Sequence, residues 1–380
     1  MKKLRVGVIF GGRSGEHEVS VRSARAVIDA LDARRYEVVP IAITKEGKWL
    51  SPARATRLLP EETKKRVADK VASEERQPSA LIGDPSSNGL VARESSGEDD
   101  ALAPLQPLDV VFPVLHGTFG EDGTIQGWLE MVGMPYVGCG VLASSCGMDK
   151  VAMKALFKEA GLPICRYTWL LRKDWDEDRG AILRRVVREI GFPSFVKPAN
   201  LGSSVGISKA SDKSSLERAI DLAARYDRKV IIEEGLDARE IECAVIGNEK
   251  PEASLPGEYV VKDPAAAFLD YTEKYSGTGH VEFVVPAPLP KSLTERIRRL
   301  AVRAYQSLDC AGLARVDFFL RRDTRELLVN ELNTIPGLTD VSGFPKMWEA
   351  SGLPFPRVLD RLIELALDRH KEKARNETSI

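Results

Sequence analysis

The sequence predicts an α/β protein of more than one domain that opens with a parallel β-sheet. An apolar run from Leu4 to Phe10 leads into a glycine loop at 11–15, and apolar side chains then recur at helical spacing from Val21 to Leu31. Strand, glycine loop and helix form the first half of a βαβ unit. The length of 380 residues is also large for one hydrophobic core, so two or three domains are expected.

The N-terminal domain is predicted to cover 1–138, with a Rossmann-like parallel sheet. Further buried strands are expected over 37–44 and 109–115, and the second of these leads directly to His116. Loops at the carboxyl ends of such strands hold ligands in open α/β sheets. The intervening segment, about 51–107, is a polar insertion rich in Pro, Ser, Gly and charge, and its charged run at 94–100 is expected to be flexible and on the surface.

Two further units follow, predicted to cover 139–232 and 233–380. The first helix begins at Asp149, whose side chain can cap it, and ends before Gly161. The remaining expected elements are helices over 178–190, 213–224, 293–308 and 356–367, strands over 192–197, 229–233 and 239–246, a long loop over 261–280 and a frayed basic tail over 369–380.

Composition argues against several classes of protein. With 55 Lys plus Arg against 56 Asp plus Glu, the net charge is -1, which gives no reason to expect a nucleic-acid partner. The 5 cysteines include no CxxC pair, so free thiols in a reducing compartment are expected rather than a zinc site. No apolar run reaches membrane-spanning length, and no apolar segment of a signal peptide follows the first lysines. We therefore expect a cytoplasmic protein without a membrane partner.

The most informative chemical signal is a predicted hairpin near the C-terminus. Arg315 and Asp317 alternate on one strand and Glu331 and Asn333 on the next, so each pair shares one face of the sheet. Pairing the strands would gather three oxygen ligands, Asp317, Glu331 and Asn333, beside one arginine. Magnesium takes such ligands when it also holds phosphates, and a guanidinium can stabilise developing charge. The alternative is a solvated hairpin with incidental charges, but the acids end apolar strands rather than lying in the turn.

A second signal is the segment from Lys197 to Gly206, which has strand character on both sides. Its glycines let backbone N–H groups approach an anion, Ser203 and Ser204 add hydroxyl donors, and Lys197 adds a positive charge. It is not a Walker A loop, because no Gly-Lys-Ser/Thr sequence opens a helix here. A β-hairpin flap over a nucleotide is one interpretation and a plain hairpin turn is the other. The predicted metal site in the same chain favours the flap.

With further motifs, these segments resemble a known family. The motifs are GGRSGEHEVS at 11–20, HG at 116–117, GEDGTIQG at 120–127, GMDK at 147–150, EE at 233–234 with Glu240, EKY at 273–275 and the stretch 315–337. The chain resembles the ATP-grasp ligases, and among them the D-alanine–D-alanine ligases, over nearly its whole length. The resemblance implies three α/β domains with ATP clamped between the last two. It also implies that two D-alanines are joined for peptidoglycan, consuming one ATP.

The resemblance assigns ATP binding to residues of the second and third units. These residues are Lys150, Lys197, Ser204, Glu233, Glu234, Leu236, Glu240 and Lys274. The lysines would contact the phosphates, the segment 233–236 the adenine and Glu240 the ribose. The implied cofactors are two Mg²⁺ (or Mn²⁺) ions, held by Asp317, Glu331 and Asn333.

The resemblance also assigns the D-alanine chemistry. The implied catalytic residues are Glu16, Ser203, Tyr275 and Arg315, and the implied substrate-binding residues are Glu16, His116, Arg315, Gly337 and Ser342. Glu16 would hold the ammonium of the first D-alanine, whose carboxylate attacks the γ-phosphate to give an acyl phosphate. The amine of the second D-alanine would attack the acyl carbon, with Arg315 and the Gly337 backbone stabilising the oxyanion. Ser203 and Tyr275 would link to Glu16 and close the site, and Ser342 would lie near the second carboxylate.

Simpler interpretations remain for four of these residues. Glu16 could favour a helix N-terminus through the helix dipole, and His116 could be a loop histidine whose hydrogen bonds are all satisfied. Lys150 could be a solvated helix residue, and Tyr275 could serve loop packing.

Other functions also remain open at this stage. They are synthesis of D-alanyl-D-lactate or D-alanyl-D-serine, another ATP-grasp carboxylate–amine ligation, and non-catalytic nucleotide binding. Tyr275 favours the dipeptide, because relatives that make the ester lack it. The retained metal ligands and Arg315 argue against a non-catalytic protein. A homodimer is expected from the family.

Overall fold

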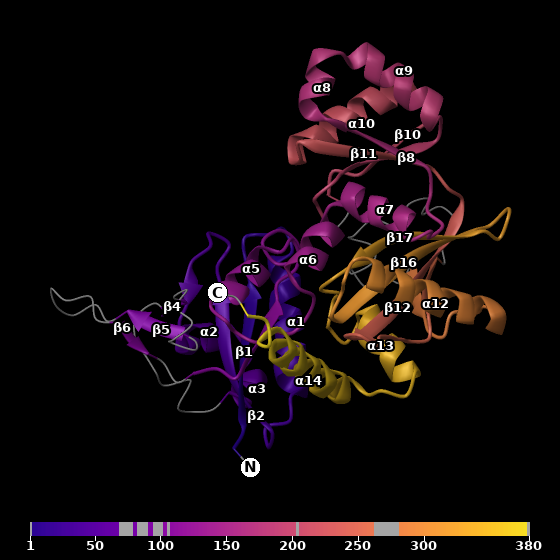
Figure 1. Cartoon of the computed structure of the whole chain (residues 1–380). Helices are drawn as coiled ribbons and strands as arrows, with labels where there is room; N and C mark the ends of the chain where they lie inside the picture. Colours follow the sequence, from indigo (N-terminus) through magenta and orange to yellow (C-terminus); the bar gives the residue numbers. More distant parts are fainter. Residues whose placement is uncertain are drawn as a thin grey trace.

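The computed structural model describes residues 2–67, 79–81, 90–93, 102–104, 107–202, 205–261 and 281–377. Within these ranges the strands form three main sheets and one small one (Figure 1). None of the helices in these ranges combines the length and apolar composition needed to cross a membrane.

The N-terminal sheet has the strand order β3-β2-β1-β7. Its strands are β1 at Leu4–Gly11, β2 at Tyr36–Ile43, β3 at Trp49–Leu50 and β7 at Val110–Val114. Strands β2 and β7 pair with β1 in parallel, as the βαβ pattern predicts. Helix α1 (His17–Ala30) buries Ala24, Val27 and Ile28 against this sheet, because these side chains recur at helical spacing. Helices α5 (Thr124–Met131) and α6 (Val141–Met148) were not predicted from the sequence.

The first part of the polar segment packs onto the N-terminal core. Ser51 caps α2 (Pro52–Arg57) and α3 (Glu61–Lys64) follows. The apolar side chains of Ala55, Leu59 and Val67 belong to the buried N-terminal core, so a few well-spaced apolar residues outweigh the polar composition. Farther along, β4 (Ser79–Leu81), β5 (Leu90–Arg93) and β6 (Leu102–Pro104) form the small antiparallel sheet. The charged run at 94–100, expected to be flexible, lies outside the described residues.

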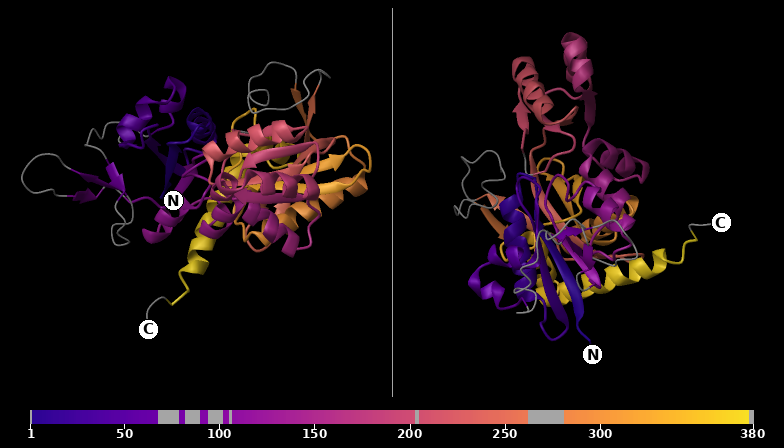
Figure 2. Two further views of the ribbon diagram at one scale, coloured as in Figure 1. Left: turned by 90° about the horizontal axis from the view of Figure 1, so that it is seen from above. Right: turned by 90° about the vertical axis from the view of Figure 1, so that its left-hand side faces the viewer.

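A central unit has its own sheet, in the order β10-β9-β11-β8. Its elements are β8 (Tyr167–Leu171), α8 (Arg172–Glu177), α9 (Arg179–Glu189), β9 (Ser194–Pro198), β10 (Ser208–Ala210), α10 (Lys213–Tyr226) and β11 (Lys229–Glu234). Asp212 and Ser215 form a capping box at the start of α10. This unit has a separate core around Trp175 and Ile220, and it stands apart from the other sheets in Figure 1 and in the right view of Figure 2.

The C-terminal sheet has the order β15-β14-β12-β16-β17, with β13 paired to β12. Its strands are β12 (Ala238–Gly247), β13 (Glu252–Ala253), β14 (Gly257–Val261), β15 (Val281–Val284), β16 (Gly312–Arg321) and β17 (Leu327–Asn333). Helices α7 (Lys150–Glu159) and α12 (Lys291–Ser307) share a buried core with this sheet. Asp149 caps α7 as predicted. The long loop predicted over 261–280 lies almost entirely outside the described residues, and the boundaries proposed at 138 and 232 stay predictions.

The C-terminal end of the chain is helical where fraying was expected. After α13 (Gly343–Ala350), helix α14 runs from Phe355 to Lys373. Arg369 donates to the carbonyls of Gly138 and Tyr136, and its guanidinium lies 4.3 Å from the centre of the Tyr136 ring. The basic residues therefore find acceptors on the N-terminal domain, which extends the helix. Apolar residues of α14 also join the N-terminal core.

Candidate active site

The predicted metal hairpin forms, with a register shift between Asp317 and Phe318. Strands β16 and β17 are antiparallel, Asp317 lies opposite Glu331, and Arg315 lies opposite Asn333. The next strand, β12, adds a third carboxylate, because Glu242 lies opposite Asp317. Side chains directly opposite each other share one face of a sheet, so three carboxylates lie in a line across three strands.

Arg315 lies between two of these carboxylates. Its Nε and Nη2 atoms each donate to Asp317 at 2.6 Å, and its Nε lies 3.3 Å from Oε1 of Glu242. The side chains of Arg315 and Glu242 are largely buried, so their charges act through a weakly screening medium. The guanidinium is thereby held between Asp317 and Glu242.

Two lysines face Glu331 from other elements. Lys150, the first residue of α7, lies 3.9 Å from the Glu331 carboxylate and donates to the Leu201 carbonyl at 2.8 Å. Burial alone would raise the pKa of Glu331, but the charges of Lys150 and Lys197 outweigh it and lower that pKa. Glu331 is therefore ionised at neutral pH and can bind a cation.

A second carboxylate, Glu233, is enclosed by lysines. Its side chain is 3% exposed, and its two oxygens form ion pairs with Lys197 at 2.7 Å and Lys154 at 2.9 Å. Burial opposes ionisation, yet the two ammonium groups lower the pKa of Glu233 to about 2. Lys197 has its pKa raised, because the attraction of Glu233 exceeds the effect of burial. All three groups are therefore charged at neutral pH.

The neighbouring residues of the predicted adenine segment have other environments. Glu234 accepts from the backbone N–H of Arg166 at 2.8 Å and from its Nε at 2.9 Å. Leu236 and Glu240 are half-buried, and Glu240 lies on β12 opposite Phe319. Glu233, by contrast, contacts Lys197, one of the predicted phosphate-binding lysines.

An acidic cluster forms where the N-terminal loops meet the central unit. Oxygen or nitrogen atoms of Glu16, His116 and Glu121 all lie within 4.8 Å of one another. A side chain at Gly202 would approach Glu16 Oε1 to 3.3 Å, so the loop after Lys197 lies directly against this cluster. Burial, and then the nearby charge of Glu121, raise the pKa of Glu16 to about 7.

His116 connects this cluster to the C-terminal hairpin. Its Nδ1 donates to the carbonyl of Ile335 at 2.9 Å, and its Nε2 lies 3.0 Å from the Ser23 hydroxyl. Although burial lowers its pKa, the carboxylates of Glu121 and Glu16 raise it overall. Because Ile335 follows Asn333 closely, the ring joins the acidic cluster to the end of the metal hairpin.

Ser342 and Gly337 lie together at the start of α13. Ser342 is the N-cap residue, and its hydroxyl accepts from the backbone N–H of Thr339 at 3.1 Å. A Cβ atom at Gly337 would lie 2.7 Å from that hydroxyl. A side chain at Gly337 would therefore displace the Ser342 hydroxyl, and Gly337 itself is half-buried.

Comparison with known proteins decides the family. Residues 5–139 match the family model described as the D-ala D-ala ligase N-terminus, and residues 156–364 match that of the D-ala D-ala ligase C-terminus. The chain belongs to the D-alanine–D-alanine ligase family. This ligase has the ATP-grasp fold expected from its sequence, and it is an ATP-dependent enzyme.

Individual relatives cover this ligase from end to end. The D-alanine–D-alanine ligase of Natranaerobius thermophilus is 45% identical over 380 residues, or 100% of this chain and 99% of the relative. That of Thermoanaerobacter sp. is 48% identical over 375 residues, or 99% of each. Among solved structures, the D-alanine-D-alanine ligase from Coxiella burnetii has a TM-score of 0.78 at 35% identity, covering 98% of both chains. The VanG D-Ala:D-Ser ligase from Enterococcus faecalis has a TM-score of 0.80 at 34% identity, covering 96% of this chain and 100% of its own.

Some predicted site residues of this ligase lie outside the described ranges, and some described ones were not predicted. Ser203, Ser204, Lys274 and Tyr275 belong to the first group. Glu121, Lys154 and Glu242 belong to the second. Lys154 follows Lys150 by four residues on the same helix face, but exposed Lys158 follows Lys154 by the same spacing, so the sequence did not single Lys154 out.

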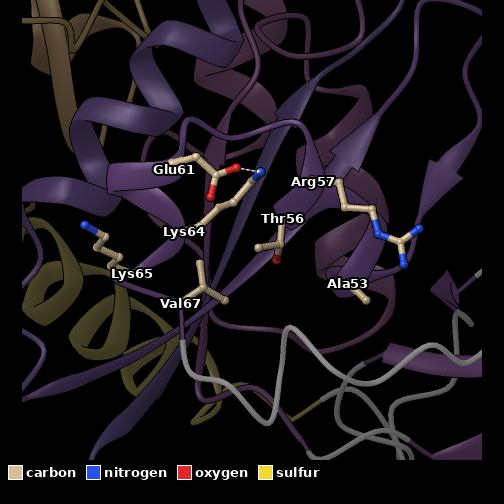
Figure 3. A pocket seen from close by; sticks show the side chains of 7 residues that line it. All are labelled: Ala53, Thr56, Arg57, Glu61, Lys64, Lys65 and Val67. Atoms are coloured by element: carbon tan, nitrogen blue, oxygen red, sulfur yellow. Dashed lines mark hydrogen bonds and ion pairs between the residues drawn. The ribbon is translucent and has the colours of Figure 1, made fainter.

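A separate surface cavity of about 400 Å³ lies beside α2 and α3 (Figure 3). Its lining residues are Ala53, Thr56, Arg57, Glu61, Lys64, Lys65 and Val67. Lys64 forms an ion pair with Glu61 there. Among the described residues that line this cavity, none is a predicted site residue.

Proposed function

We propose that this ligase joins two D-alanines through an acyl phosphate at the seam between its sheets. The observation that carries the proposal is the register of the hairpin, which sets Asp317 against Glu331 beside Arg315. Lys150 and Lys197 bring positive charge to Glu331 from two other elements. Carboxylates for a metal, lysines for phosphates and an arginine for developing charge are what phosphoryl transfer followed by acyl transfer requires.

ATP is proposed to lie along the lysines, with Lys150, Lys197 and Lys274 at its phosphates. The segment 233–236 binds the adenine and Glu240 the ribose, while Ser204 adds a donor from the Lys197 loop. The ion pair of Glu233 with Lys197 supports this arrangement, because it fixes a cation beside the segment assigned to the adenine.

Two magnesium or manganese ions are proposed as cofactors. Asp317, Glu331 and Asn333 fit them, because their donor set is all oxygen, with two carboxylates and one amide. The ions would neutralise phosphate charge on ATP when bound. Removing them with a chelator should abolish ADP formation, and added Mg²⁺ should restore it.

The order of bond changes follows from the charges in the site. Glu16 holds the ammonium of the first D-alanine, whose carboxylate oxygen attacks the γ-phosphorus as the bond to ADP breaks. The free amine of the second D-alanine then attacks the acyl carbon, inorganic phosphate leaves, and the amine loses a proton. Arg315 and the Gly337 N–H stabilise the oxyanion of that second step.

The remaining substrate roles complete this proposal. His116 contacts the first amino acid through the cluster with Glu16, and Ser342 lies beside the carboxylate of the second. Ser203 and Tyr275 link to Glu16 and close the site. The close approach of Gly202 to Glu16 supports the role of Ser203, which is the next residue along the chain.

D-Serine is a second candidate for the attacking amino acid, because a D-Ala:D-Ser ligase is among the similar structures. The more similar relatives, at 45% and 48% identity, are D-alanine–D-alanine ligases, so D-alanine is the proposed substrate. Phosphate release should be measured with D-alanine alone and with added D-serine, D-lactate or L-alanine, with product identification. D-Alanyl-D-alanine as the main product supports the proposal, and a mixed product as the main one contradicts it.

The ligase is further proposed to be a cytoplasmic homodimer. Its 5 cysteines are free thiols, as expected in a reducing compartment. Two contacting helices, α5 and α6, expose Met131 (73%) and Leu142 (60%), and exposed apolar groups of this kind mark interaction surfaces. Sedimentation should give a dimer that Met131→Glu weakens and Leu58→Glu, a matched exposed site on α2, does not. A monomeric unmodified chain contradicts the proposal.

A further inference from the structure

Lys154 is a buried cation to which the proposed chemistry gives no role. It lies on α7 and is 1% exposed. Its Nζ atom lies 2.9 Å from Glu233, donates to the Asn330 carbonyl at 3.1 Å and lies 3.6 Å from Cys165 Sγ. A buried ammonium is strongly destabilising unless it is paired. The site therefore retains a buried charge that is destabilising without its main partner, Glu233. The same Glu233 also forms an ion pair with Lys197.

The charge balance of this cluster depends on Lys154. Two lysines share one carboxylate, so Lys154, Glu233 and Lys197 together carry a net charge of about +1. Without Lys154, the pair that remains is neutral. Glu233 would then cancel most of the attraction of Lys197 for a polyphosphate, and it would also be free to turn its second oxygen toward Lys197.

The position of Lys154 links the two sheets of the site. Helix α7 shares its core with the C-terminal sheet, whereas Glu233 and Lys197 belong to the central sheet. On β17, the Asn330 carbonyl accepts from Lys154 and the Leu332 N–H contacts the sulfur of Met153 at 3.2 Å. These two contacts bracket Glu331, so the same short stretch of α7 fixes the metal strand and the phosphate-binding lysine.

We propose that Lys154 is a positioning residue for ATP, acting through Glu233 on Lys197. It holds one oxygen of Glu233, so that the other oxygen orients Lys197 without neutralising the site. The inference rests on the ATP site proposed above. It adds that a lysine without direct access to the nucleotide sets the affinity for ATP.

The test compares three variants with the unmodified enzyme by titration calorimetry with Mg-ATP in the absence of D-alanine. Lys154→Met removes the charge but keeps much of the length, and it should weaken ATP binding about tenfold to a hundredfold, the range for a lost buried charged contact. Lys154→Arg, which keeps the charge, should restore most of the affinity. Lys158→Met is the matched control, an exposed lysine one turn farther along α7, and it should bind ATP like the unmodified enzyme.

A second arm separates positioning from a merely structural role. The KM for D-alanine at saturating ATP should change by less than about twofold in Lys154→Met, because the defect lies in the nucleotide site. In a Glu233→Gln background, adding Lys154→Met should cost little further affinity, since both act on Lys197. If Lys154→Met does not fold, Lys154→Gln replaces it and should show the same loss, because the charge is what matters.

A failure of the Lys154 inference and a failure of the proposed ATP site give different results. A folded Lys154→Met or Lys154→Gln protein with a lower melting temperature but unchanged ATP affinity overturns the inference, as do fully additive effects with Glu233→Gln. If the unmodified enzyme itself fails to bind ATP, the ATP site proposed above is wrong. That result is distinguishable, because it appears before any variant is compared.

Discussion

Glu16 should make the free enzyme less stable as the pH rises through neutrality. Its pKa is raised from 4.5 to about 7 by burial and then by Glu121, against the opposing charges of His116, Arg315 and Lys150. A carboxyl with a raised pKa in the folded state binds its proton more tightly there than in the unfolded chain. Its stabilising contribution is therefore complete below pH 4.5 and is lost as the pH passes through 7.

The size of the effect follows from that difference in pKa. Each pKa unit corresponds to about 1.4 kcal/mol, so ionising Glu16 in the folded enzyme costs roughly 3 kcal/mol at most. The side chain is half-buried, and solvent screening reduces the expected value to about 2 kcal/mol. Glu16→Gln cannot ionise. As the pH rises from 5 to 8, the free energy of unfolding of Glu16→Gln should therefore increase by about that much relative to that of the unmodified enzyme.

Urea unfolding of both proteins across pH 5–8.5, without ATP or D-alanine, measures this difference directly. Glu18→Gln is the matched control, two residues farther along in the first turn of α1. Its carboxylate is exposed and pairs with Lys45, which lowers its pKa, so this variant should gain no stability at pH 8. A difference between Glu16→Gln and the unmodified enzyme that stays constant across the pH range would refute the reasoning.

The same pKa predicts how the first D-alanine binds. An ammonium is held by the ionised form of Glu16, so below pH 7 binding must also displace a proton. The KM for the first D-alanine should therefore rise about tenfold from pH 6.5 to 5.5. Glu16→Gln should bind D-alanine weakly at every pH and lose this dependence.

Three further expectations concern the metal, the chain end and the product. Glu331→Gln should fold normally but lower turnover roughly a hundredfold, as measured by phosphate release at limiting Mg²⁺; near-normal turnover would exclude it as a ligand. Arg369→Ala should destabilise the enzyme by about 1–2 kcal/mol, seen as a lower melting temperature, whereas exposed Lys371→Ala should not. Dipeptide formation should increase from about pH 6 to 9, because the attacking amine must be neutral; dominant ester formation with D-lactate at neutral pH would contradict an amine-specific site.

Local patterns predicted the parts of the site that lie on single hairpins. Alternation on apolar strands predicted the hairpin and the face that its polar residues share, because a strand has a side-chain period of two. The register shift that sets Asp317 opposite Glu331 was not predicted. The β9–β10 hairpin after Lys197 was predicted from the strand character on both sides of its loop. Both hairpin predictions depend only on residues within about twenty positions of one another, where turn and strand signals are strong.

Contacts between distant segments could not be derived from such patterns. His116 meets the carbonyl of Ile335 more than two hundred positions away, and Lys154 meets Glu233 across two sheets. A lysine in an amphipathic helix is normally solvated, so nothing local distinguishes Lys154 from exposed Lys158. The helix at the chain end was missed for the same reason, because its basic residues are stabilised by carbonyls of the N-terminal domain.

The distribution of cores explains why the site is built from charges. The N-terminal sheet and α14 share one core, α7 and the C-terminal sheet share another, and the central sheet has a third. Lys197 and Glu233 therefore face Lys154 and Glu331 across a boundary between cores, where ion pairs rather than apolar packing make the contact. Ion pairs can exchange partners with a phosphate or a metal ion, whereas close-packed apolar groups cannot do so without leaving a cavity. Binding of ATP can thus alter the contact between the sheets directly, so the affinity for ATP should respond to substitutions at this boundary more strongly than to those in any one core.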